Sequence, residues 1–106
     1  MPKPSAPAPV AIRAALKQLG ADVSEARRRR RLTMEVVANR ALTTRQTVAR
    51  IERGDPVVAM GTWASVLFAL RLANRLGDLA APASDREGLA IEAERLPKRV
   101  RMPKTI

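Results

Sequence analysis

The sequence predicts an all-α fold, a compact five-helix bundle with flexible termini. Apolar residues recur at three- and four-residue spacing, as they do on the buried face of a helix. Good N-cap residues and glycine stops punctuate the chain between these apolar stretches. No stretch alternates convincingly as a strand, although residues 89–93 are compatible with a short one. The length of 106 residues suits a single small domain.

Prolines and one glycine predict the organisation of the first part of the chain. Residues 1–10 carry four prolines, which disfavour helix and predict a disordered tail. Residues 11–19 and 23–31 are both typical of helix. Gly20 interrupts them, which leaves open one broken helix or two consecutive short ones.

Two short helices are predicted next, over residues 34–41 and 45–53. Thr33 and Thr44 precede them, and a threonine hydroxyl can accept from a free amide of the first helical turn. Gly54 supplies a left-handed stop for the second helix, and the proline that follows prevents its continuation.

A further helix is expected to open at Gly61 or Thr62 and to bury a stripe formed by Trp63, Val66, Leu67 and Leu70. Residues 74–79 predict a shorter helix with inward leucines at positions 72, 76 and 79, which also offer a dimer contact. A loop at 82–85 and a weakly structured stretch from 86 follow. The expected organisation is a tail over 1–10, a helical domain over 11–80 and a basic tail over 81–106.

The net charge of the chain indicates which classes of partner it can bind. Twenty Lys and Arg against ten Asp and Glu give a net charge of +10, which favours DNA, RNA or an anionic membrane. Cysteine and histidine are absent, which excludes disulfides, thiolate zinc sites and histidine bases. Without a glycine-rich phosphate loop, and with scattered carboxylates, we expect no enzyme and no cofactor. No apolar run approaches a membrane span of about 20 residues, so we expect a cytoplasmic protein.

With their caps included, the two short helices span 33–41 and 44–53 and are separated only by Leu42-Thr43, which is typical of a helix-turn-helix whose second helix reads the DNA major groove. At about 100° per residue, Val48 and Ile51 face the core. The opposite arc, about 140° wide, holds Arg45, Gln46, Ala49, Arg50 and Arg53.

Those outer residue types suit base contact. Arginine donates two hydrogen bonds to guanine O6 and N7, and glutamine pairs with adenine N6 and N7. A small residue such as Ala49 leaves room for close approach or touches a thymine methyl. We therefore predict base contacts from Arg45, Gln46, Ala49 and Arg50.

Five consecutive arginines, 27–31, precede the motif, and two or three of them are expected to reach the DNA backbone, since one helix cannot turn all five to one side. The predicted backbone contacts in and around the motif are Arg29, Arg31, Thr33, Thr43, Thr44, Thr47 and Arg53.

The residues of this region resemble the Xre/Cro family of repressors, over about residues 20 to 80. The resemblance rests on Arg27, on Leu32-Thr33-Met34-Glu35-Val36-Val37-Ala38 and on the run from Thr43 to Gly54. It implies a lambda-repressor-like fold, base contacts at Arg45, Gln46 and Arg50, and phosphates near Thr33, Thr43 and Thr44. It also implies a structural ion pair between Arg27 and Glu52, which would be costly to break from one side.

Two positions depart from that family. Met34 stands where glutamine usually contacts the DNA backbone, so one clamp is lost. Leu42 stands where the turn often has glycine. If the backbone there has positive φ, leucine costs about 1–2 kcal/mol; a slightly different turn is equally possible.

The second half is similar to the HipB-type antitoxins, on residues 54–70 and on the Arg95–Arg101 segment. That resemblance implies a HipA-like serine/threonine kinase toxin as partner and repression of a shared operon. A homodimer is expected because such repressors bind palindromes with recognition helices roughly 34 Å apart.

Three other functions compete with a repressor that is also an antitoxin. A stand-alone repressor would lack a kinase-like toxin gene as its neighbour. A basic RNA-binding protein would prefer RNA to duplex DNA in competition. A membrane-active peptide is disfavoured, because the apolar stripes are spread over several short helices that can bury one another.

Overall fold

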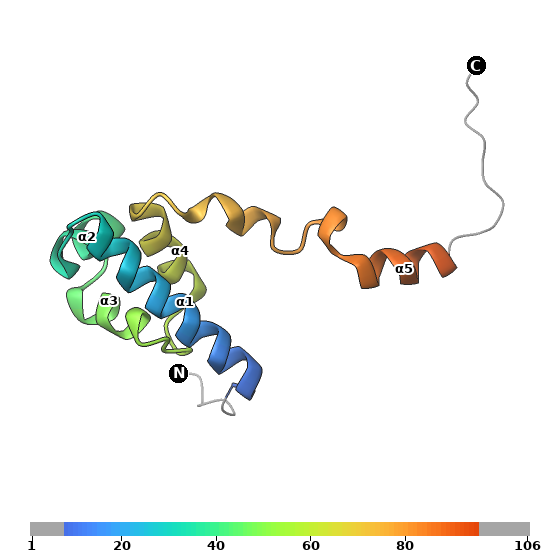
Figure 1. The fold of residues 1–106 in the computed structure, drawn as a ribbon, viewed down its shortest axis with the longest axis horizontal. Coiled ribbons are helices and arrows are strands. Elements are labelled where there is room, and N and C mark those ends of the chain that lie inside the picture. Colours follow the sequence, from blue (N-terminus) through green and yellow to red (C-terminus); the bar gives the residue numbers. More distant parts are fainter. Residues whose placement is uncertain (1–7, 96–106) are drawn as a thin grey trace, which may run out of the picture. The chain divides into compact units, whose positions relative to one another are not determined.

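The computed structural model describes residues 8–95, and these are helical, with no strand among them (Figure 1). The predicted all-α class is thus confirmed for the described residues. The chain divides into two units, one ending at Asn74 and the other beginning at Arg75. The single compact five-helix bundle is therefore wrong. The expectations for residues 1–7 and 96–106, a proline-rich tail and a basic tail, lie outside the described residues.

The first helix, α1 (Val10–Arg29), runs without a break through Gly20. The interruption expected there is wrong, and tertiary packing explains the glycine. A Cβ at position 20 would collide with the carbonyl oxygen of Ile51 and lie 2.8 Å from the amide nitrogen of Gly54. Gly20 is thus the point where α1 lies against the end of the third helix.

Two eight-residue helices follow, α2 (Met34–Ala41) and α3 (Arg45–Glu52). Both predicted N-caps are confirmed. The Thr33 hydroxyl accepts from the Val36 amide, and the Thr44 hydroxyl accepts from the Thr47 amide, each at 3.1 Å. Local sequence alone therefore determines where both helices begin.

The helix α4 (Met60–Ala69) packs against α2, while α3 packs against both α1 and α2 (Figure 1). It begins at Met60, slightly earlier than predicted. The predicted stripe of Trp63, Val66, Leu67 and Leu70 is buried, which confirms it as core. The rest of the apolar core consists of Val23, Ala26, Val37, Ala38, Ala41, Val48 and Ile51.

All four helices of the first unit end in the same way. A residue with positive φ follows each helix, and the next residue donates its amide to a carbonyl five positions back, a Schellman motif. The left-handed residues are Arg31, Leu42, Gly54 and Arg71. One of the four is glycine, and a Cβ there would also meet backbone, the Cα of Lys17 at 2.6 Å. The other three sites accept a side chain at the cost of backbone strain.

The second unit holds no buried residue among those described. A 3-10 helix, η1 (Ala73–Asp78), leads into it from the first unit, where a fifth bundle helix was expected over 74–79. Leu72 and Leu79 are exposed rather than inward. A short 3-10 turn, η2 (Pro82–Ser84), precedes α5 (Arg86–Arg95). Two predictions are therefore wrong for residues 86–95, which form a helix: the weakly structured stretch expected from residue 86 and the strand considered at 89–93.

Within the described residues, no helix combines the length and the apolar composition that crossing a membrane requires.

Candidate nucleic-acid interface

The helix α3 is divided into a buried face and an outer face. Val48 and Ile51 are fully buried against α1 and α2. Arg45, Gln46 and Arg53 are exposed, and Ala49 and Arg50 are half-buried between them. The structure therefore brings the predicted base-contacting residues together on one surface.

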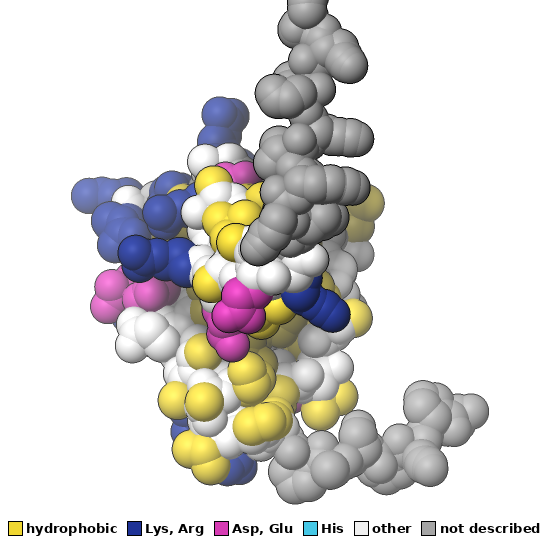
Figure 2. Space-filling view, turned by 90° about the vertical axis from the view of Figure 1, so that its right-hand side faces the viewer, with side chains coloured by type: hydrophobic (Ala, Val, Ile, Leu, Met, Phe, Trp, Pro, Cys, Tyr) yellow, Lys and Arg dark blue, Asp and Glu magenta, His cyan; other side chains and the backbone are white. Residues whose placement is uncertain are grey.

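Most polar side chains of that outer face make no hydrogen bond within the described part of the chain. The side chains of Arg45, Gln46 and Arg53 make no hydrogen bond to any of residues 8–95. Arg45 and Gln46 lie in the first turn of α3. Their donors and acceptors face solvent, so a ligand can bind them without first breaking a contact within the fold. Figure 2 shows Lys and Arg side chains gathered toward one edge of the face in view.

Arg50 is the exception on this face. Its Nε donates to Oδ2 of Asp55 at 2.8 Å, and the two side chains are 37% and 24% exposed. The other carboxylate oxygen, Oδ1, accepts from the Val57 amide at 2.8 Å. These two bonds, first that from Val57 and then that from Arg50, lower the pKa of Asp55 below its ordinary value. Sequence reasoning placed Arg50 but missed its partner.

The predicted threonines lie around the two helix starts. Thr33 and Thr44 spend their hydroxyl oxygens as caps, and Thr44 also donates to the hydroxyl of Thr47 at 3.0 Å. Thr43 is half-buried in the connection between α2 and α3. The positive ends of two helix dipoles lie at these threonines, an arrangement that favours anions such as phosphate.

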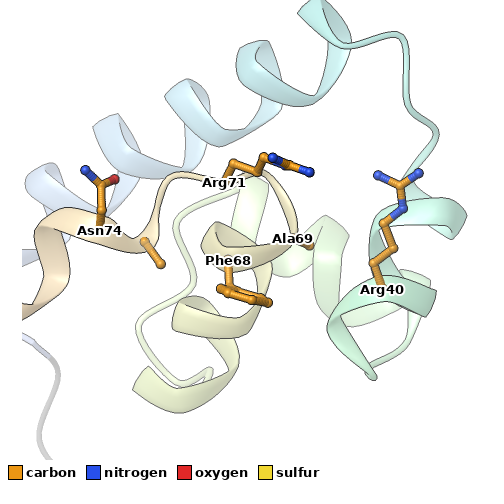
Figure 3. Close-up of a pocket in the computed structure, with 6 residues that line it drawn as sticks. Arg40, Phe68, Ala69, Arg71 and Asn74 are labelled. Carbon is orange, nitrogen blue, oxygen red and sulfur yellow. The ribbon is translucent and has the colours of Figure 1, made fainter.

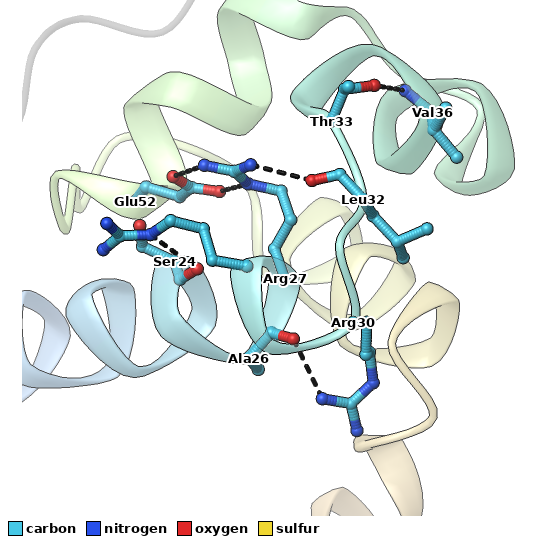
Figure 4. Close-up of polar contacts among 9 residues, drawn as sticks. Ser24, Ala26, Arg27, Arg30, Leu32, Thr33, Val36 and Glu52 are labelled. Atoms are coloured by element: carbon cyan, nitrogen blue, oxygen red, sulfur yellow. Dashed lines mark hydrogen bonds and ion pairs between the residues drawn. The ribbon is translucent and has the colours of Figure 1, made fainter.

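The five consecutive arginines at the end of α1 have different surroundings, and Figure 4 shows two of them, Arg27 and Arg30, pointing to different partners. Arg28 and Arg30 donate to carbonyl oxygens of their own helix, those of Ser24 and Ala26. Arg29 and Arg31 are exposed, and neither side chain bonds to another described residue. Of the five, the two that were predicted to contact the DNA backbone, Arg29 and Arg31, are thus the two whose side chains make no hydrogen bond to a described residue.

Arg27 is turned inward instead. Its Nε and Nη2 meet the two oxygens of Glu52 at 2.7 and 3.1 Å, and its Nη1 donates to the carbonyl oxygen of Leu32 at 2.9 Å (Figure 4). The side chains are only 13% and 7% exposed. The hydrogen bond to Glu52 outweighs burial and raises the pKa of Arg27. One guanidinium thus joins the end of α1, the residue before the α2 cap and the end of α3.

The structure also shows the surroundings of Leu42 and Met34, the two residues that depart from the resembled family. Leu42 adopts φ 58° and ψ 44° with its side chain 92% exposed, so the turn is left-handed despite the leucine. Met34 is half-buried at the first position of α2. Its thioether offers no donor to a phosphate at that helix start.

A separate hollow lies on another part of the first unit (Figure 3). Phe68, 74% exposed on α4, lies in it with Arg40 of α2 and Arg71 after α4. None of its lining residues belongs to α3, so this hollow and the outer face of α3 are distinct surfaces.

No family model, no curated protein and no solved structure matches this chain. The fold and the site define it as a small all-helical protein with an arginine- and glutamine-bearing helix on its surface.

Proposed function

We propose that this chain is a sequence-specific double-stranded DNA-binding protein that acts as a transcriptional repressor. In this proposal α2 and α3 form the helix-turn-helix of a lambda-repressor-like domain, and α3 enters the major groove. The observation that carries it is the division of α3, with Val48 and Ile51 buried and Arg45 and Gln46 exposed without internal partners.

The dimensions and the charge support a groove-binding role. A single α-helix fits the major groove, and α3 is rigidly held on its inner side, with Glu52 bonded to Arg27. Arg45, Gln46, Ala49 and Arg50 then approach base edges. Phosphates on either side would lie near the residues predicted above: Arg29, Arg31, Thr33, Thr43, Thr44, Thr47 and Arg53. The net charge of +10 attracts the duplex from a distance.

One α3 helix buries too little surface for tight specific binding, so the proposal includes a homodimer on a palindromic operator. On the resemblance to HipB-type antitoxins, we further propose that the protein restrains a HipA-like kinase toxin and represses their shared operon. A repressor without a toxin remains the competing form of the same proposal. Co-purification with the product of a neighbouring kinase-like gene distinguishes the two.

The test is selection of binding sites from random duplexes by the full chain, followed by affinity measurements on the selected site. Arg45→Ala and Gln46→Ala should each cost about 1–3 kcal/mol of specific affinity and relax the preference at one base position per half-site. Arg13→Ala removes an exposed α1 arginine outside the proposed interface and is the matched control. Arg29→Ala should weaken specific and non-specific binding alike.

Two results would overturn the proposal. Selection that yields no preferred sequence rules out specific reading. Stronger binding to RNA than to duplex DNA at equal salt concentration assigns the basic surface to an RNA partner instead.

A further inference from the structure

The ion pair between Arg50 and Asp55 connects the outer face of α3 to the loop behind it. Asp55 is the last residue of the Schellman motif that ends α3, and its amide donates to the Arg50 carbonyl oxygen at 3.1 Å. Its carboxylate then returns to the Arg50 side chain at 2.8 Å. Both the backbone amide and the carboxylate of Asp55 are thus bonded to Arg50.

Asp55 is itself fixed in place. Its Oδ1 accepts from Val57, two residues on, which closes a turn and orients the carboxylate. Both oxygens are used, one for the loop and one for the guanidinium. The carboxylate is therefore held by the loop independently of its bond to Arg50.

The bond takes a particular nitrogen of Arg50. A guanidinium can pair with a guanine edge either through Nε and one Nη or end-on through both Nη groups. Because Nε is bonded to Asp55, only the end-on pair is left. Neither Nη atom bonds to any residue within 8–95, and the side chain is more than one-third exposed.

We propose that Asp55 is a positioning residue for sequence recognition, which holds Arg50 so that its two Nη groups meet guanine O6 and N7 end-on. This inference rests on the proposed DNA-binding function. Ordering an arginine before binding removes a cost that is equivalent to about two- to twelve-fold in affinity. Half-neutralising the guanidinium also makes Arg50 a poorer contact for phosphate, so the pair favours base reading over general attraction.

Asp55→Asn isolates this role. The asparagine keeps an oxygen for the Val57 amide, so the turn is retained, but its amide group cannot accept from Arg50. On the selected duplex, preference for the base read by Arg50 should fall about two- to twelve-fold. Binding to an unrelated duplex should strengthen, and its logarithmic salt slope should steepen by up to about one, because Arg50 becomes free for phosphate.

These opposite changes separate positioning from mere loss of structure, which would weaken both kinds of binding. Asp85→Asn is the matched control, because Asp85 also accepts a nearby backbone amide, that of Gly88 at the start of α5, but has no arginine partner within residues 8–95. It should leave preference and salt slope unchanged. In an Arg50→Ala background, Asp55→Asn should no longer alter base preference.

Unchanged preference in Asp55→Asn overturns the inference, and so does improved preference, which would show that Asp55 withholds Arg50 from DNA. A wild-type chain that selects no site at all instead overturns the proposed function. If Asp55→Asn does not fold, exchange of the Arg50 Nε proton is measured by NMR in the wild-type chain without DNA, where no guanine can protect that proton. Slow exchange supports the retained bond, and exchange as fast as that of a free arginine overturns it.

Discussion

Replacing Gly20 with alanine should destabilise the protein, against the usual preference of helices. In an ordinary helix interior, alanine is more stable than glycine by about 0.5–1 kcal/mol. Here the new Cβ would lie against three backbone atoms, the carbonyl oxygens of Ile51 and Glu52 and the amide nitrogen of Gly54. Backbone cannot rotate away as a side chain does, so α1 and α3 must separate.

Overpacking of this kind costs about 1–3 kcal/mol, which exceeds the gain in helix propensity. We expect a net loss of about 1–2 kcal/mol and, for a domain of this size, a fall in Tm of roughly 5–15 °C. The assay is thermal unfolding followed by circular dichroism, at one protein concentration and one salt concentration.

Gly61→Ala is the matched control, since Gly61 lies in the first turn of α4 and a Cβ there meets nothing within 4 Å. It should raise the stability slightly, by about 0.5 kcal/mol. If Gly20→Ala raises Tm as Gly61→Ala does, α1 does not lie close enough to the end of α3 for the new Cβ to collide with its backbone.

Two further substitutions test other parts of the first unit, both by urea unfolding. Leu42→Gly relieves a left-handed leucine that is almost fully exposed, and should stabilise the protein by about 0.5–1 kcal/mol after the added freedom of the unfolded chain is subtracted; a loss of stability would show that the leucine side chain makes a contact that matters. Glu52→Ala strands the Arg27 guanidinium and should cost about 3 kcal/mol, whereas replacing both residues with methionine should cost less; equal losses would mean that the charge is not stranded.

The parts of the fold that sequence predicted well are those set by local chemistry. Thr33 and Thr44 each offer a hydroxyl at the right distance along the chain from a free amide, and both act as caps. The spacing of Val48 and Ile51 determines which face of α3 is buried without reference to any neighbour. Such signals are contained within a few residues and survive folding.

Errors arose where the cause lies elsewhere in the chain. Gly20 resembles a helix breaker until the end of α3 is seen against it. None of the residues of α5 is buried, so the helix needs no apolar face. Its sequence therefore has mixed charge and no apolar periodicity from which a helix could be predicted. Asp55 lies in a loop that no helical projection includes, although an acidic residue five positions after an outer-face arginine is a signal that can be sought.

The outer face of α3 contributes almost nothing to the core. Arg45 and Gln46 are exposed, bonded to no other described residue and separated from the buried side of the same helix. Their replacement leaves the packing of Val48 and Ile51 untouched, so residues at these two positions can be changed without altering the core. If α3 binds DNA as proposed, new pairs at positions 45 and 46 can be screened as a library on one scaffold, so that differences in the selected sequence report on these two side chains.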